Sequence, residues 1–283
     1  MSIAQHIVPP GPSLFARLCA HPAARVVLGI VVTMLPITLT MLLADILVPK
    51  PLRVVWPMLL AAALSVSAYR WFVIRLEQRQ PTELSLRGAA RETGIGVAFG
   101  AALGLTVAGV LAAAGAFVIT GSSDSWSFLL KCLPEQIMVA CFEEILFRAV
   151  VFRIVEQRWG TRAALLTSMV LFALAHLSND NISVMGIAMT GIASLVFSAC
   201  YLRTRRLWLP MGLHFAWNST YDGLFALPMS GHAARGWLQV SLSGPEWLTG
   251  GGYGVEASVV TLVVWGAAAI LMLRQRPANV LAH

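Results

Sequence analysis

The sequence contains little charge. Only 12% of its 283 residues are Asp, Glu, Lys or Arg, against about 25% in an average soluble domain, and 58% are hydrophobic. Several apolar stretches exceed the roughly 18 residues needed to cross a hydrocarbon layer. These proportions argue against a water-soluble fold and predict a polytopic membrane protein.

Several signatures of other protein classes are missing. The four cysteines form no CxxC pair, so we expect neither a disulfide framework nor a thiolate metal site. The sequence has no HExxH, the simplest zinc-hydrolase signature, and no GxSxG to support a serine nucleophile. It shows no internal repeat or inverted pair of broken spans, which argues against a transporter. Its basic residues are scattered singly, so we expect no nucleic-acid partner.

Apolar runs between polar breaks predict about eight membrane-spanning segments. We expect each to be helical, because lipid offers no partner for exposed backbone amides. The predicted fold is therefore an all-α, polytopic integral membrane helix bundle. A cytoplasmic tail over 1–23 precedes a single transmembrane domain over 24–283, whose catalytic core spans about 126–228. The predicted spans lie at about residues 24–48, 54–74, 93–120, 126–152, 161–178, 182–202, 207–228 and 255–273.

The basic residues orient these spans. If the N-terminus is cytoplasmic, 15 of the 20 Lys and Arg residues fall in inside segments and four in outside segments, and Arg148 lies within a span. By the positive-inside rule this split predicts that both termini are cytoplasmic. We expect a multi-pass protein of the bacterial inner (plasma) membrane, with the lipid bilayer as a partner. The segment 229–254 then forms an outer loop.

The third predicted span is rich in small residues. Its glycines recur at intervals that let neighbouring helices approach closely. We therefore expect this span to present a packing face. The glycines are Gly94, Gly96, Gly100, Gly104 and Gly109.

Ionisable and amide side chains inside the spans concentrate in the second half of the chain. A charge deep in a bilayer costs at least about 2.5–3.5 kcal/mol, so such residues are functional candidates. The fourth span contributes two glutamates and an arginine, the fifth a histidine, and the seventh a histidine and an asparagine. They are Glu143, Glu144, Arg148, His176, His214 and Asn218.

Helix geometry separates the two glutamates. Glu144 and Arg148 lie one turn apart, so Arg148 can neutralise Glu144. Glu143 is rotated by about 100° from Glu144 and cannot share that contact equally. We assign Glu143 to chemistry and Glu144 with Arg148 to positioning, and the reverse assignment stays open. His214 and Asn218 are also one turn apart, so both can face one point.

Depth along the helices suggests a common site. At 1.5 Å per residue, Glu143, His176 and His214 lie about 15, 21 and 12 Å from the basic ends of their spans. Three helices could therefore meet around one water-filled cavity, which we expect to be reached from the cytoplasm. Each residue alone could have a purely structural role, as part of a buried ion pair or as a hydrogen-bonding histidine. The combination favours a functional site, because a bundle packed only by apolar contacts would not need so many buried polar groups.

A carboxylate with two imidazoles suits activation of water for attack on a carbonyl. Without a metal, Glu143 acts as general base, His176 orients the water, and His214 and Asn218 donate hydrogen bonds to the oxyanion. With a metal, His176, His214 and a glutamate such as Glu143 bind Zn²⁺ and lower the pKa of a bound water. The residues alone do not decide between these versions.

Three short motifs carry a family resemblance. Glu143-Glu144-x-x-x-Arg148, Phe172-x-x-x-His176 and His214-x-x-x-Asn218 resemble, in order, the motifs of the CAAX-processing and bacteriocin-processing (CPBP) family of intramembrane proteases, which includes the type II CAAX prenyl endopeptidases. The stretch from Tyr201 to Pro210 is also similar. The likeness covers about residues 135–222. Ala149 departs from it, because many relatives have glycine after the motif arginine.

The resemblance implies an intramembrane endopeptidase in which Glu143 activates water, His176 lies in the same site, and His214 and Asn218 stabilise the oxyanion. Relatives are called metalloproteases, and a metal-free glutamate mechanism has also been proposed for them. The implied partner is a peptide or lipidated protein substrate, such as a prenylated CAAX tail, which we expect at the cytoplasmic leaflet. The alternative is a non-proteolytic membrane protein for regulation or bacteriocin self-immunity.

Overall fold

The computed structural model describes residues 21–233 and 235–274. Residues 1–20 of the predicted tail over 1–23 lie outside the described residues. Both chain termini, which we predicted to be cytoplasmic, also lie outside them. The described part is mostly helical. By length and composition, four of its helices are apolar enough to cross a membrane, namely α2, α3, α4 and α7. The count of eight spans and their orientation stay predictions.

A helix lies in each predicted span. Two of the helices continue without a break into π-helical segments, η3 after α5 and η4 after α8. Short 3-10 turns and the four-residue helix α9 (Glu246–Thr249) occupy the connections. The longer helices are α2 (Pro22–Leu47), α3 (Trp56–Arg75), α4 (Ala89–Ala113), α5 (Ser127–Glu144) with η3 (Ile145–Phe152), α6 (Arg153–Ala175), α7 (Val184–Thr204), α8 (Trp208–Asn218) with η4 (Ser219–Leu224), and α10 (Val259–Arg274).

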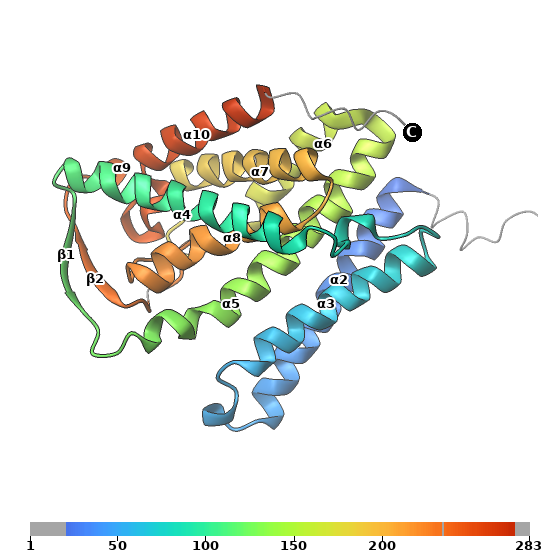
Figure 1. Cartoon of the computed structure of the whole chain (residues 1–283), viewed down its shortest axis with the longest axis horizontal. Coiled ribbons are helices and arrows are strands. Elements are labelled where there is room, and N and C mark those ends of the chain that lie inside the picture. Colours follow the sequence, from blue (N-terminus) through green and yellow to red (C-terminus); the bar gives the residue numbers. More distant parts are fainter. Residues whose placement is uncertain (1–20, 234, 275–283) are drawn as a thin grey trace, which may run out of the picture.

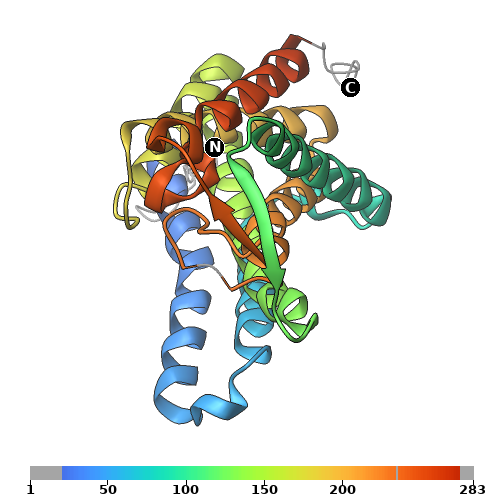
Figure 2. The same cartoon turned by 90° about the vertical axis from the view of Figure 1, so that its left-hand side faces the viewer.

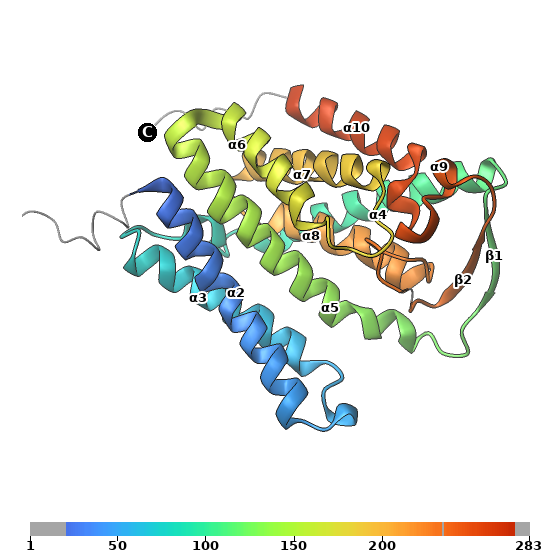
Figure 3. The ribbon, with the colours of Figure 1, turned by 180° about the vertical axis from the view of Figure 1, so that it is seen from behind.

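The helices form a bundle from which one hairpin projects. Helices α4, α7, α8 and α10 run roughly alongside one another, and α5 crosses them obliquely (Figure 1). Helices α2 and α3 pair with each other and extend past the bundle, as Figure 3 shows from behind. Leu42, Leu43, Ile46 and Leu47 on the projecting part of α2 are exposed. Such a long apolar exposed surface fits contact with lipid better than contact with water.

Glycines of α4 set its close contact with α8, as expected for a packing face. A Cβ on Gly96 would lie 2.3 Å from the Leu209 carbonyl oxygen, and one on Gly100 would lie 2.3 Å from that of Leu213. Neither backbone could stay where it is with a larger side chain. Because Leu213 directly precedes His214, this contact fixes the position of a candidate site residue. Gly94 and Gly109, in contrast, face open space.

A small two-stranded β-sheet accompanies the helices of the predicted bundle. Strand β1 (Phe117–Ser122) pairs antiparallel with β2 (Leu238–Leu242) and covers one end of the bundle (Figure 2). The predicted span 93–120 is therefore too long. Helix α4 ends at Ala113 because Gly115 adopts a positive φ of 72°. Backbone bonds close a Schellman cap there, from Gly115 N–H to Ala112 and from Ala116 N–H to Leu111.

The break after the fourth span is also shorter than predicted. We expected a connection over 153–160, but the helix continues from η3 into α6 and turns at Gly160, which has φ 82° and ψ 170°. Glycine reaches this conformation without a steric penalty. The basic residues that suggested a loop, such as Arg153, lie on continuous helix instead.

Candidate active site

A buried ion pair lies at the centre of the site. Arg148 Nε is 3.2 Å from Glu144 Oε2, and both side chains are fully buried. This is the contact that their one-turn spacing predicts. Glu144 Oε1 also lies 2.9 Å from Nδ1 of His214. Glu144 therefore joins an arginine of η3 to a histidine of α8.

The surroundings of Arg148 compensate its burial. Its Nη2 donates to the carbonyl and hydroxyl oxygens of Ser194, at 3.1 and 3.3 Å. Its guanidinium also lies about 5 Å from the ring centres of Phe172 and Phe197, within the range of cation–π attraction. A buried charge needs such partners to offset the loss of water. Arg148 is thus fixed between α5, α6 and α7.

Glu143 faces the other nitrogen of the same histidine. Its Oε2 is 3.9 Å from His214 Nε2, and it has no hydrogen-bond partner among the described residues although the atom is buried. The His214 ring stacks on Phe197, with ring centres 4.6 Å apart. The two glutamates therefore differ in environment, since Glu144 is fully buried between Arg148 and His214, whereas Glu143 lines the cavity and has only the longer contact with His214.

His176 lies at the end of α6. Its Nδ1 is 2.7 Å from the Phe172 carbonyl oxygen, a contact that requires a proton on Nδ1 and leaves Nε2 as an acceptor. The side chain lines a cavity of about 360 Å³ together with Glu143, His214 and Asn218. The structure thus brings these four predicted residues to one cavity and places Glu144 and Arg148 behind it.

A chain of polar side chains extends the site from Asn218, and sequence reasoning missed its central member. Asn218 Nδ2 donates to Gln136 Oε1 at 3.0 Å, and Gln136 Nε2 donates to Asp222 Oδ2 at 3.0 Å. Arg235 then contacts Asp222 at 3.1 Å and Glu135 at 2.6 Å. The available signal was spacing, because Gln136 precedes Glu143 by seven residues and so lies on nearly the same helix face.

Arg235 lies in the segment that we predicted as an outer loop, and it is held by two carboxylates. Burial alone would lower the pKa of its guanidinium, but the hydrogen bond with Glu135 and the charge of Asp222 raise that pKa above its ordinary value. Arg235 therefore stays charged and holds its loop against α5 and η4.

Part of the cavity lining comes from connections between the predicted spans. Besides the four candidates, Asn179, Met229, Ser230, His232 and Arg235 line it. These residues belong to connections that we predicted outside, at the end of the bundle away from the arginine-rich segments. The side of the membrane from which the cavity is reached, and the depth of these residues in the bilayer, stay predictions.

The arrangement does not fit the zinc alternative as it stands. Among the described residues, no group of three His, Cys, Asp or Glu side chains is placed so that it could hold a metal ion. This applies to the set His176, His214 and Glu143. The Nδ1 atoms of the two histidines contact the Phe172 carbonyl oxygen and the Glu144 carboxylate, so only Nε2 of each ring could bind a metal.

Comparison with known proteins identifies the segment that holds the site. Residues 125–220 match the family model described as type II CAAX prenyl endopeptidase Rce1-like. The match covers about a third of the chain and includes all three motifs, so it confirms the resemblance to CAAX-type intramembrane proteases. The searches of curated proteins and of solved structures found no match.

Proposed function

We propose that the protein is an intramembrane endopeptidase that hydrolyses a peptide bond of a membrane-associated or prenylated peptide, with water activated by Glu143. The carboxylate of Glu143 carries this proposal, because it lines the cavity and its Oε2 makes no hydrogen bond among the described residues. This oxygen lies 3.9 Å from His214 Nε2, a separation that one water molecule can bridge with two ordinary hydrogen bonds. A peptide carbonyl placed beside that water would meet a nucleophile and a base together.

The first step is addition of water. Glu143 takes one proton as the water oxygen bonds to the carbonyl carbon, and the carbonyl π electrons move to oxygen and form an oxyanion. His214, protonated on both nitrogens, can donate from Nδ1 to Glu144 and from Nε2 to the oxyanion. Asn218 gives one amide hydrogen to Gln136 and keeps the second for the same oxygen. Fixed donors of this kind stabilise charge that appears only in the transition state.

The second step is cleavage. The oxyanion electrons return to form the carboxyl product, the C–N bond breaks, and the leaving nitrogen takes the proton held by Glu143. His176 Nε2 faces the cavity as an acceptor and can orient the water before attack. The pair Glu144 and Arg148 reacts with nothing, and its role is to hold His214.

The test is cleavage of prenylated and unprenylated peptides by the full-length protein in detergent micelles, with and without a chelator and with the metal content measured. The proposal expects peptide products from the wild-type protein, and a loss of about 10²-fold or more in His176→Gln. His232→Gln is too near the cavity to serve as a control, so Glu156→Gln, on the far part of α6, is the matched control. A protein that cuts neither peptide would overturn the proposal and favour the non-proteolytic alternative.

The same assay addresses the metal question. The mechanism above expects the rate to survive chelation in a preparation measured as metal-free. If chelation abolishes cleavage and zinc restores it, the water is activated by a metal, and the side chains must rearrange from the geometry described.

A further inference from the structure

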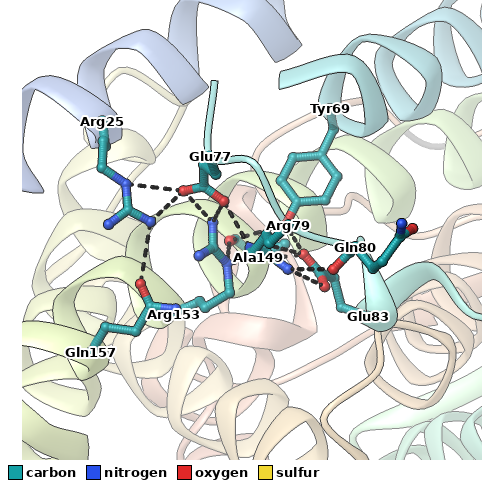
Figure 4. Close-up of polar contacts among 9 residues, drawn as sticks. All are labelled: Arg25, Tyr69, Glu77, Arg79, Gln80, Glu83, Ala149, Arg153 and Gln157. Atoms are coloured by element: carbon teal, nitrogen blue, oxygen red, sulfur yellow. Dashed lines mark hydrogen bonds and ion pairs between the residues drawn. The ribbon is translucent and has the colours of Figure 1, made fainter. Parts of the chain in front are cut away.

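A second polar cluster lies outside the candidate site, around the connection between α3 and α4 (Figure 4). We call it the arginine cluster. It is built from two buried glutamates and the arginines and tyrosine that surround them, on α2, α3, the connection and α6. Its members are Arg25, Tyr69, Glu77, Arg79, Glu83 and Arg153.

The cluster meets the site-bearing helix where that helix changes its hydrogen bonding. In the π-helical segment η3, the backbone N–H of Arg153 donates to the Arg148 carbonyl, five residues earlier. That donor is the one that an α-helix would give to Ala149. π-helical segments are rare, and in them each backbone hydrogen bond reaches one residue further along the chain than in an α-helix. Here this change lies directly after Glu143 and Glu144.

The side chain of Arg153 replaces the missing donor. Its Nε donates to the Ala149 carbonyl oxygen at 2.7 Å. The Tyr69 hydroxyl lies 3.3 Å from the same oxygen, but it has the shorter contact with Glu83, to which it donates. A buried carbonyl without partners would cost free energy. Arg153 therefore satisfies the carbonyl that the π register leaves without its usual α-helical donor.

Buried carboxylates hold Arg153 in place for this contact. Its Nη2 lies 2.8 and 2.7 Å from the two oxygens of Glu77, and its Nε is 3.9 Å from Glu83. Arg25 and Arg79 share Glu77 at 2.5 and 2.9 Å. Both glutamate side chains are only 2% exposed, so the geometry has little freedom to change.

We propose that Arg153, held by Glu77, is a positioning residue for the catalytic site. By bonding the Ala149 carbonyl, it fixes the π register in which the preceding residue, Arg148, reaches Glu144. Glu144 in turn holds His214 Nδ1. The inference rests on the proposed peptidase function, because it assigns Arg153 to the alignment of that same site.

The test is Arg153→Lys in the full-length protein. Lysine keeps the charge, but a single ammonium group cannot reach Ala149 and Glu77 as the forked guanidinium does. We expect kcat per folded molecule to fall by about ten- to hundredfold, as for other small misalignments of reacting groups, with KM unchanged. Arg205→Lys is the matched control, because Arg205 pairs with Glu156 outside the cluster.

A second measurement does not need activity. In protein with ¹⁵N-labelled histidine, the ring signal of His214, identified by its loss in His214→Gln, should shift in Arg153→Lys and stay unchanged in Arg205→Lys. A role in stability alone would lower the thermal midpoint without moving this signal in the folded protein.

The outcomes separate the two proposals. Wild-type kcat and an unchanged His214 signal in Arg153→Lys would overturn the positioning role, whether or not the wild type cleaves peptides. If the wild type cuts no peptide but the His214 signal still shifts, the alignment role holds and the peptidase proposal fails.

Discussion

At the scale of single residues, the two adjacent glutamates have opposite relations to their surroundings. Glu144 is fully buried between Arg148 and His214, whereas 14% of the Glu143 side chain is exposed and its contact with His214 is 3.9 Å long. Burial with an ion-pair partner is typical of a structural carboxylate. A carboxylate that lines a cavity can contact water or substrate there.

This difference predicts that replacing each glutamate with glutamine affects stability to different extents. Glu144→Gln leaves Arg148 charged and buried without its ion-pair partner, so we expect the free energy of unfolding to fall by about 3–5 kcal/mol. Glu143→Gln removes no ion pair with an arginine and should leave stability nearly unchanged. Thermal unfolding of both variants in the same detergent checks this. Equal losses of stability would contradict the division of roles.

The buried glutamates of the arginine cluster give a pH dependence. Burial would raise the pKa of Glu77, but the charge and hydrogen bonds of Arg153 and Arg25 lower it below the ordinary value of 4.5. The pKa of Glu83 is lowered in the same way, by Arg79 and Tyr69 against the effect of burial. Both groups lie on the connection between α3 and α4.

A lowered folded-state pKa means that the folded protein binds fewer protons than the unfolded chain. The stabilisation is therefore complete above about pH 4.5 and is lost as the pH falls through the lower folded-state values. We expect the thermal midpoint to drop on acidification below that pH, with a smaller drop in Glu77→Gln. Identical pH profiles for the two proteins would show that Glu77 contributes none of the acid sensitivity.

At the scale of elements, the site depends on how closely α4 approaches α8. The absence of side chains at Gly96 and Gly100 lets the two backbones touch beside His214. Small residues at such contacts are a common means of packing helices in membranes. The orientation of His214 is thus set partly by glycines that contact no site residue.

Two alanine substitutions on the same helix test this contact. A Cβ at position 100 would lie 2.3 Å from the Leu213 carbonyl oxygen, whereas Gly94 has nothing within 4 Å. We expect Gly100→Ala to displace α8, lowering the thermal midpoint and the cleavage rate by about tenfold or more. Gly94→Ala should have neither effect. The two variants differ only in what the new methyl group meets, so similar behaviour would contradict the packing account.

The sequence predicted the helices better than the strands and the π-helical segments between or within them. Long apolar runs locate α2, α3, α4 and α7 because hydrophobicity depends only on composition. Spacing also placed Glu144 against Arg148, since helix geometry is regular. It missed the two-stranded β-sheet, which forms through pairing between residues more than 100 positions apart.

Two further features that the sequence did not predict, the π segment η3 and the role of Gln136, also have physical reasons. The π segment η3 could not be predicted, because the donor that replaces the α-helical bond to Ala149 comes from the side chain of Arg153. Gln136 is uncharged and so gave no signal of an expensive buried group. Its importance appears only when Asn218 and Asp222 lie on either side of it.

At the scale of the whole molecule, the orientation of the bundle in the membrane is a prediction from its basic residues. The predicted cytoplasmic connections contain most of the arginines, and several residues that line the cavity, such as Asn179 and Ser230, lie on connections predicted to be outside. The direction from which substrate arrives therefore follows from the orientation of the bundle.

Cysteine accessibility measures that orientation. In a background without native cysteines, Leu86→Cys and Val184→Cys place thiols at exposed positions on the two ends of the bundle. The positive-inside rule predicts that an impermeant thiol reagent labels position 184 in intact cells and position 86 only after permeabilisation. The reverse pattern would invert the bundle and open the cavity to the cytoplasm.

The central claim is that Glu143 activates the water that cuts the peptide. The most direct measurement is the cleavage rate of Glu143→Gln at saturating peptide, relative to wild type, in preparations with matched thermal midpoints. The account predicts that this isosteric change lowers the rate by about 10²-fold or more while the protein stays folded. Cleavage by folded Glu143→Gln at the wild-type rate would contradict it.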